Sequence, residues 1–257
     1  MQGLIVTADD FGMSLEINAA VEDAHRNGIL SAASLMVAGD AASDAVARAR
    51  AMPGLGVGLH LVLVDGRPML PPARLPDLVD GSGRFPGNMT LLGVRIFFSA
   101  RARRQAEAEI RAQFDAFRAT GLALDHVNAH HHFHIHPALR DIVIGLAPEY
   151  GVRAIRLPRE PGLTAGNAIV APFVASLRRR LDRAGVAHND WQLGLTGTGA
   201  MNATRTRNML AVLPGGVTEI YFHPASGNDD HRALVDPGVR TLLAERDLQP
   251  MTFAALQ

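Results

Sequence analysis

The sequence contains no cysteine, so neither disulfide bonds nor thiolate zinc sites can form. Aromatic residues make up only 5% of the chain, which argues against a stacking platform for nucleic-acid bases. The 25 basic and 25 acidic side chains balance, so no electrostatic attraction to nucleic acid is indicated. No apolar run reaches the length of a membrane span, and residues 1–7 lack the apolar core of a signal peptide. We therefore expect a cytoplasmic protein without a nucleic-acid partner.

Histidine, by contrast, is concentrated in one short stretch. Of the eleven histidines, five lie between His130 and His136. A mostly apolar segment, 122–127, precedes the stretch and is expected to be a strand, and Pro137 follows it at the expected start of a helix. A tag or a solvated loop is the alternative, but an internal position between a strand and a helix is not typical of a tag. Because neutral imidazole binds divalent metals and exchanges protons near pH 7, we predict a metal-binding or catalytic role.

Short apolar segments alternate with amphipathic segments along the whole chain. Strands are expected at 4–6, 33–37, 57–61, 122–127, 152–157, 191–195, 217–222 and 250–253. Helices are expected at 14–27, 40–52 (capped by Asp40), 100–120, 137–150, 170–184, 202–213 and 237–245. The alternation predicts an α/β fold with a parallel sheet. Seven or eight such units favour a TIM-like (β/α) barrel, incomplete or distorted, within a single domain spanning 1–257.

Residues 62–99 interrupt the alternation. Five prolines and four glycines break up the first part of this segment, and an apolar run follows at 91–98. The segment is too long for a simple connection, so we interpret it as an excursion inserted over the C-terminal ends of the strands. The apolar run is expected to pack on the body of the protein, and a lipid-facing or substrate-facing patch is the alternative.

Polar side chains stand at or just beyond the ends of several expected strands: Asp9, Asp10, His60, His130, Arg156 and His223. In a (β/α) barrel the C-terminal ends of the strands converge on one face, where sites are built. One carboxylate and two imidazoles form a common divalent-metal site with positions left for water and substrate. A second carboxylate can accept a proton from water, and a further histidine can protonate a leaving group. This set supports hydrolysis of an amide, ester or phosphate without deciding which.

Four parts of the chain together resemble the YdjC-like (chitooligosaccharide deacetylase-like) carbohydrate deacetylases: Ala8-Asp9-Asp10-Phe11-Gly12, His60, the run from His126 to His136, and Glu219 to Pro224. The resemblance implies a barrel-like, metal-dependent N-deacetylase of acetylated amino sugars. It also implies that Asp10, His60 and His130 hold the metal, that Asp9 is the base and that His223 is the acid.

The segments 60–68 and 75–79 further resemble the hopanoid-biosynthesis-associated branch of this family. That resemblance implies a lipid-linked substrate, the N-acetylglucosaminyl head group of a hopanoid, and peripheral contact with the inner membrane face. Soluble N-acetylated chitooligosaccharides are the alternative substrate. We also expect Arg156, His132 and His134 to contact the substrate.

The chain departs from the family pattern where Asn128-Ala129 precedes the histidines, a position at which members usually carry Asp-Ser. An extended chain would point His130, His132 and His134 to one side and His131 to the other. The ligand set accepts zinc or magnesium, with manganese, nickel or cobalt also suitable. A metal-dependent phosphoesterase that uses Arg156 and Arg159 to hold phosphate and a non-enzymatic metal-binding scaffold are rival interpretations, and a homodimer is the expected assembly.

Overall fold

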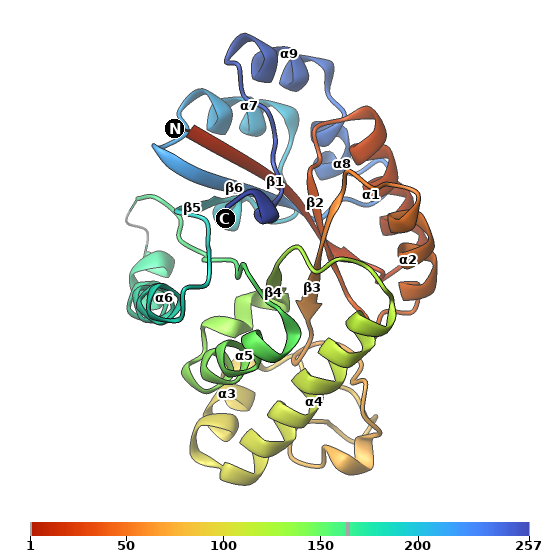
Figure 1. The fold of residues 1–257 in the computed structure, drawn as a ribbon, viewed down its shortest axis with the longest axis vertical. Helices are drawn as coiled ribbons and strands as arrows, with labels where there is room; N and C mark the ends of the chain where they lie inside the picture. Colours follow the sequence, from red (N-terminus) through yellow and green to blue (C-terminus); the bar gives the residue numbers. More distant parts are fainter. Residues whose placement is uncertain (1, 163–164, 257) are drawn as a thin grey trace.

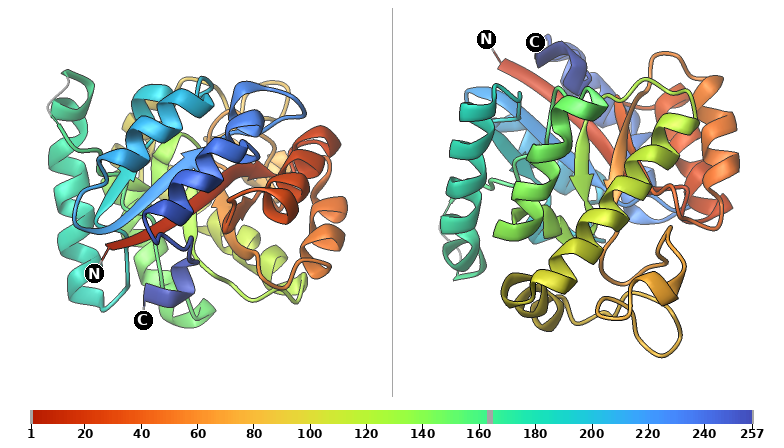
Figure 2. Two further views of the ribbon diagram at one scale, coloured as in Figure 1. Left: turned by 90° about the horizontal axis from the view of Figure 1, so that it is seen from above. Right: turned by 60° about the horizontal axis from the view of Figure 1, so that its bottom comes forward.

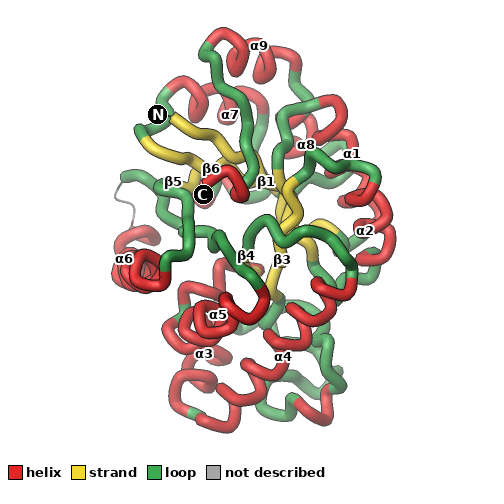
Figure 3. Tube along the Cα trace, in the orientation of Figure 1, coloured by secondary structure: helices red, strands yellow, loops and turns green. Residues whose placement is uncertain are grey.

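The computed structural model describes residues 2–162 and 165–256. Six parallel strands form one sheet in the order β4-β3-β2-β1-β6-β5 (Figure 3). The strands are β1 (Gln2–Phe11), β2 (Ala32–Leu35), β3 (Gly56–Leu61), β4 (Val127–Ala129), β5 (Trp191–Leu193) and β6 (Gly216–Phe222). β1 lies in the interior of the sheet between β2 and β6, and Leu4, Ile5 and Val6 are completely buried. This run of apolar residues is typical of a parallel strand covered on both faces.

An irregular segment joins the two edges of the sheet. The backbone N–H of Val127 in β4 donates to the carbonyl of Ala154, and the N–H of Arg156 donates back to Val127, both at 3.0 Å. On its other side, the N–H of Ile155 donates to the carbonyl of Ala187, at 3.0 Å, a few residues before β5. The sheet is therefore a curled half-barrel, and isolated bridges link its β4 edge to the chain that leads into β5, which is consistent with the prediction of a distorted (β/α) barrel.

Helices surround the strands, as Figures 1 and 2 show. They are α1 (Leu15–Asn27), α2 (Ala42–Arg50), α3 (Met89–Phe98), α4 (Ala100–Ala119), α5 (Pro137–Tyr150), α6 (Ala165–Ala184), α7 (Ala203–Ala211), α8 (Asp229–Leu234) and α9 (Pro237–Glu245). Local signals set several boundaries. The Ser14 hydroxyl accepts the N–H of Ile17 at the start of α1, and Gly151 adopts a left-handed conformation with φ 64° after α5.

Three expected strands differ from the structure. Regular pairing in the segment 122–127 starts only at Val127, although Asp125 and His126 already bond to β3. Residues 152–157 and 250–253 form only isolated bridges, because each meets its neighbours through one or two residues. Phe253–Leu256 is instead a short 3-10 helix. Asp40 does not cap α2, since Ala41 occupies that position and the Asp40 carboxylate lies 3.2 Å from Arg67.

The excursion at 62–99 contains a short 3-10 helix, Pro72–Arg74, and α3, and it projects beside α4 (Figure 2). Leu75, Leu78, Leu92 and Ile96 are buried in the same core cluster as the strands, so its apolar residues pack partly on the body as expected. α4 holds the excursion through polar groups. Glu109 accepts the backbone N–H groups of residues 69 and 70, at 2.8 and 2.9 Å.

Among the described residues, no helix combines the length and the apolar character that crossing a bilayer requires.

Candidate metal centre

Three side chains at the ends of separate strands place one ligand atom each around a common point: Asp10 lies in β1, His60 lies in β3, and His130 directly follows β4. Asp10 Oδ1 lies 3.3 Å from His60 Nε2 and 3.1 Å from His130 Nδ1, and these two nitrogens are 3.3 Å apart. Ligands at about 2.0–2.1 Å from a tetrahedral zinc ion are separated by roughly 3.3–3.4 Å. The triangle therefore has the size of one face of a metal coordination sphere, and these are the residues that the resemblance implied as ligands.

Unusual backbone geometry turns these ligands toward one another. Asp10 has a φ of 64°, and the pairing register of β1 shifts between Ala8 and Phe11. A non-glycine residue in the left-handed region is uncommon, and such residues concentrate at functional sites. After β4 the chain turns sharply, because His131 and His132 have φ values of 52° and 55°. His130 is thereby left at the strand end, facing Asp10.

The electrostatics of the triangle favour a cation. Burial raises the pKa of Asp10, but the imidazoles of His130 and His60 outweigh burial and hold it well below its usual value. Asp10 Oδ1 is buried and makes no well-aligned hydrogen bond. Three carboxylates, those of Asp9, Asp10 and Glu219, share this region with one guanidinium, that of Arg156, which pairs with Asp9 and Glu219. The group therefore carries a net charge of about −2 when all are ionised. A divalent metal ion would balance that charge.

A second grouping of possible ligands adjoins the first. Asp65, His130 and His131 bring their ligand atoms within 4.8 Å of one another, but Asp65 and His131 are exposed. Because His130 belongs to both groupings and only the first has two buried ligands, the first is the better-built site.

Asp9 is buried beside the triangle and is bound by Arg156. The guanidinium donates from Nη1 to Asp9 Oδ2 at 2.6 Å and from Nη2 to Oδ1 at 2.9 Å. It also donates to Glu219, at 2.6 Å from Nη2. Burial raises the pKa of Asp9, but the charge of Arg156 and the neighbouring His60 lower it well below its usual value. Asp9 is therefore a carboxylate at neutral pH.

Arg156 was expected to contact substrate, and the structure corrects that expectation. Its side chain is completely buried and all its bonds go to Asp9 and Glu219. A side chain closed off in this way orients a carboxylate rather than binding a ligand from solvent. The same burial removes one of the two basic groups on which the phosphoesterase interpretation depended, and the other, Arg159, places its guanidinium over the Trp191 ring, 3.9 Å from the ring centroid.

His132 and His134 turn into the protein. His134 is buried, its Nε2 donates to the carbonyl of Arg156 at 3.0 Å, and burial lowers its pKa to about 4. Burial also lowers the pKa of His132 well below its usual value. The ring centroids of these two histidines are 6.3 Å apart, whereas His130 lies against His131 at 4.2 Å. The expected alternation is therefore wrong for His130, because residues 130–135 form a turn rather than extended chain.

His223 follows β6 and is half-buried, and its charge helps to lower the pKa of Asp9. The buried Nδ1 of His223 has no hydrogen-bond partner in the described part of the protein. Tyr221 lies between the histidines, with ring centroids 5.3 Å from His223 and 5.4 Å from His132. Its hydroxyl meets that of Thr198 at 2.8 Å, and burial raises the pKa of Tyr221 to about 12.

Sequence reasoning gave no role to Glu219 or Tyr221, and it noted Asn128 only as a departure from the family pattern. All three lie on strands whose alternate residues face the barrel interior, and Glu219, Tyr221 and His223 are spaced by two. That spacing was the available signal. It could have grouped Glu219 and Tyr221 with His223, although it could not have identified their partners.

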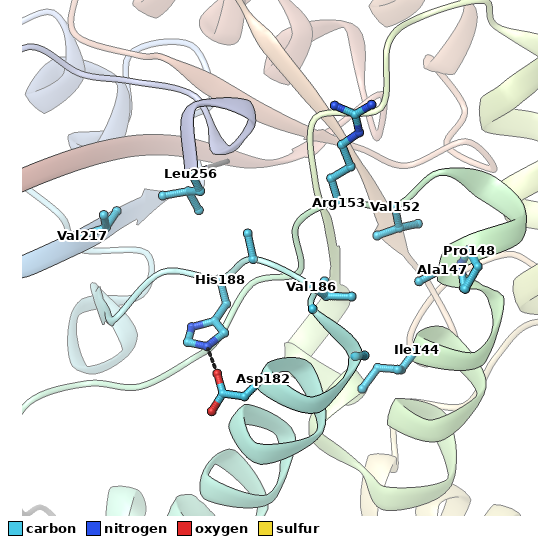
Figure 4. A pocket seen from close by; sticks show the side chains of 13 residues that line it. Ile144, Ala147, Pro148, Val152, Arg153, Asp182, Val186, His188, Val217 and Leu256 are labelled. Atoms are coloured by element: carbon cyan, nitrogen blue, oxygen red, sulfur yellow. Dashed lines mark hydrogen bonds and ion pairs between the residues drawn. The ribbon is translucent and has the colours of Figure 1, made fainter.

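A separate cavity of about 770 Å³ lies away from these residues (Figure 4). Its wall includes Val217 near the start of β6 together with Val152, Val186 and Leu256. The ion pair drawn there joins Asp182 and His188 at 3.0 Å. Since strand starts and strand ends lie at opposite ends of a barrel, this cavity is not part of the metal centre.

Comparisons with known proteins point to one family. The family model described as YdjC-like protein matches residues 3–251. A carbohydrate deacetylase of Geobacillus stearothermophilus is 33% identical over 97% of this chain and 96% of its own length. A carbohydrate deacetylase of Brevibacillus brevis is 44% identical, but the match spans 60% of this chain and 59% of that protein. A chitooligosaccharide deacetylase of Serratia marcescens is 34% identical over 66% of this chain and 64% of its own.

Among solved structures, a putative cellobiose-phosphate cleavage protein from Enterococcus faecalis superposes with a TM-score of 0.79. The match covers 99% of this chain and 98% of the other, at 23% sequence identity. At that identity the similarity shows a shared fold.

Proposed function

Because the chain belongs to the YdjC-like protein family, we propose that it is a metal-dependent hydrolase that removes the N-acetyl group from an acetylated amino sugar. The observation that carries the proposal is the ligand triangle of Asp10, His60 and His130 beside the ionised Asp9. The carbohydrate deacetylases among its relatives support the choice of an amide rather than an ester or a phosphate.

Each residue has a defined part in the proposed reaction. Asp10, His60 and His130 would hold a divalent metal ion, which would supply Lewis acidity to the attacking water and to the acyl oxygen. Asp9 accepts a proton from the water that attacks the acetyl carbon, and Arg156 keeps this carboxylate ionised and oriented. His223 donates a proton to the nitrogen as the carbon–nitrogen bond breaks, so the products are acetate and the free amine. Zinc and magnesium are the metals we favour.

Acetate release from N-acetylglucosamine glycosides tests the activity, with metal-stripped protein reloaded with zinc, magnesium, manganese, nickel or cobalt. Phosphate release from phosphate esters is measured in parallel. Asp9→Asn should lose about 2–4 decades of rate and still bind metal. Glu219→Gln is the matched control, because it removes the other carboxylate held by Arg156 without touching the proposed base. Equal activity of Asp9→Asn and wild type would move the base role to His132 or His134.

We further propose that the sugar is lipid-linked, the head group of a hopanoid at the inner membrane face. Support comes from the apolar residues that α3 exposes, Leu91, Val94, Phe97 and Phe98, which we call the α3 face. Phe98 is 80% exposed. Residues 62–106 contain seven arginines and three aspartates, a net charge of +4 in a chain that is neutral overall. An apolar face with a basic surround suits an anionic lipid surface.

The α3 face also adjoins the histidine-rich residues 130–136. The ring centroid of Phe97 lies 6.2 Å from that of His136, and a side chain at Gly93 would meet the His136 ring at 3.3 Å. A membrane docked on this face would therefore lie beside residues 130–136, and the first of these, His130, belongs to the ligand triangle. Soluble chitooligosaccharides are the competing substrate, supported by the Serratia relative.

Two comparisons separate the substrates. Initial rates are compared on a hopanoid glycoside in vesicles and on a short soluble glycoside, and Leu91→Ser and Phe98→Ser are tested on both. Burying one such side chain is worth about 1.5–3 kcal/mol, so each change should weaken use of the lipid substrate by roughly 10- to 150-fold. Val212→Ser is the control, because Val212 is an apolar residue at the end of α7 that is 77% exposed. Equal use of both substrates by all proteins would favour the soluble sugar.

A further inference from the structure

We propose that Asn128 is a positioning residue that sets the proton arrangement of the metal ligand His60 and, with the same amide group, holds Asp9. This inference rests on the proposed metal centre. Asn128 in β4 is completely buried and pairs in register with His60 of β3. Its Oδ1 lies 2.6 Å from His60 Nδ1. Its Nδ2 lies 3.0 Å from Asp9 Oδ1 and 2.8 Å from Ser34 Oγ.

These contacts fix which way the amide points. Both oxygens of Asp9 accept hydrogen bonds from the Arg156 guanidinium, so the Asn128 group that faces Asp9 Oδ1 must be the N–H of the amide. The carbonyl oxygen of Asn128 then faces His60, and an oxygen without a hydrogen requires the ring to donate from Nδ1. A hydrogen on Nδ1 leaves the lone pair of a neutral ring on Nε2. That is the atom of His60 that faces Asp10 and His130.

The arrangement is extended away from the metal centre by a buried chain of polar groups. Ser34 accepts from Asn128, and its hydroxyl also lies 3.0 Å from His126 Nε2. His126 Nδ1 lies 2.9 Å from Asp125, whose carboxylate also accepts the backbone N–H groups of residues 253 and 254. With the carboxylate as the terminal acceptor, His126 carries its hydrogen on Nδ1 and Ser34 donates to Nε2. Every donor in the chain then points the same way, from the metal centre toward Asp125.

The amide at position 128 provides both an acceptor and donors, whereas the aspartate that family members usually carry there provides acceptors alone. An aspartate at 128 would still accept from His60, but it would lose both donors and place a second negative charge about 3 Å from Asp9. An alanine would lose both functions. Comparing the variants Asn128→Asp and Asn128→Ala therefore separates the effect of the bond to His60 from the effect of the bond to Asp9.

The test measures the affinity for Zn²⁺ by competition with a chromophoric chelator, in folded proteins checked by circular dichroism. Loss of a hydrogen-bond partner to a metal-ligating histidine typically weakens metal binding 10- to 100-fold. Asn128→Ala should show a loss of that size, and Asn128→Asp should recover most of it because the bond from His60 is restored. Ser34→Ala, which removes the other partner of the amide, should bind Zn²⁺ as wild type does.

A measurement on wild type avoids dependence on how the variants fold. In the zinc-loaded protein labelled with ¹⁵N-histidine, His60 should show a hydrogen on Nδ1 and a coordinated Nε2. A hydrogen on Nε2 would overturn the inference. So would wild-type affinity in Asn128→Ala, equal weakness of the alanine and aspartate variants, or a loss in Ser34→Ala as large as in Asn128→Ala. These results leave the metal centre standing, whereas a wild type that binds no divalent metal overturns both.

Discussion

Replacing Arg156 by methionine should destabilise the protein severely, because it leaves two buried carboxylates without their cation. Methionine keeps much of the volume of the arginine stem, so the cavity left behind is small. Breaking a buried ion pair by removing one partner costs about 3–5 kcal/mol. Two carboxylates lose their cation, but we do not expect twice this loss. Asp9 keeps the hydrogen bond from the amide of Asn128, and Glu219 keeps the one from the amide of Gln192. A midpoint of thermal unfolding roughly 6–20 °C lower would follow.

The assay is urea unfolding of metal-stripped protein at pH 7, followed by circular dichroism. Arg178→Met is the matched control, because Arg178 is 47% exposed and its nearest carboxylate, on Asp182, is 3.9 Å away. Exposed pairs contribute about 0–1 kcal/mol, so this change should have little effect. Arg156→Lys should lie between the two, since it keeps the charge and loses the planar fork.

The deficit of Arg156→Met should also shrink in acid. The pKa of Asp9 is depressed in the folded protein, so its contribution to stability is present above its usual value of 3.8 and is lost as the pH falls through the folded value. Without Arg156 the pKa of Asp9 loses its main lowering influence, so lowering the pH reduces the free energy of unfolding of the variant less than that of wild type. A loss below about 1 kcal/mol at pH 7, with an effect on KM alone, would refute this reasoning and return Arg156 to substrate binding.

Three further outcomes are expected. His60→Ala and His130→Ala should each lose bound metal, measured by atomic emission, while retaining the circular dichroism of wild type; full metal content in both would exclude the triangle. The pKa of His60 is raised above 6.5, because Asp9 and Asp10 outweigh burial, so metal affinity should fall as the pH drops from 8 to 6. Glu109→Ala should loosen the excursion, seen as faster hydrogen exchange at residues 69 and 70, whereas the exposed Glu107→Ala should not.

The sequence carries most of the information that places the elements. The structure confirms the strand expected at 4–6 and the helices expected at 14–27 and 137–150, because the apolar run of β1, the Ser14 cap and the left-handed Gly151 are local signals. Segment 152–157 was wrong as a regular strand because an apolar pattern reports burial, whereas a strand also requires continuous pairing with a neighbour. Asp40 was wrong as a cap because a turn residue beside a helix can bind elsewhere.

The residues of the candidate metal centre could be predicted from the sequence, but their partners could not. Local motifs and resemblance brought Asp10, His60 and His130 to notice, and the structure brings their ligand atoms together. The pairing of Arg156 with Asp9 joins residues 147 positions apart, so no local pattern could reveal that this arginine is satisfied internally. A polar residue at a strand end looks the same in sequence whether it faces solvent or a buried partner.

The polar interior would tie folding to a bound metal ion. Carboxylates taken out of water must be compensated, and the barrel does this in two ways. Arg156 compensates Asp9 and Glu219 permanently, through five donor contacts. Asp10 has no such partner, and without metal its compensation comes from the imidazoles of His130 and His60. A proton on His60 and a metal ion thus serve the same electrostatic purpose at one position. Any ion that binds the triangle must displace that proton, which lowers the apparent affinity for the ion. The net free energy of binding then stabilises the folded protein.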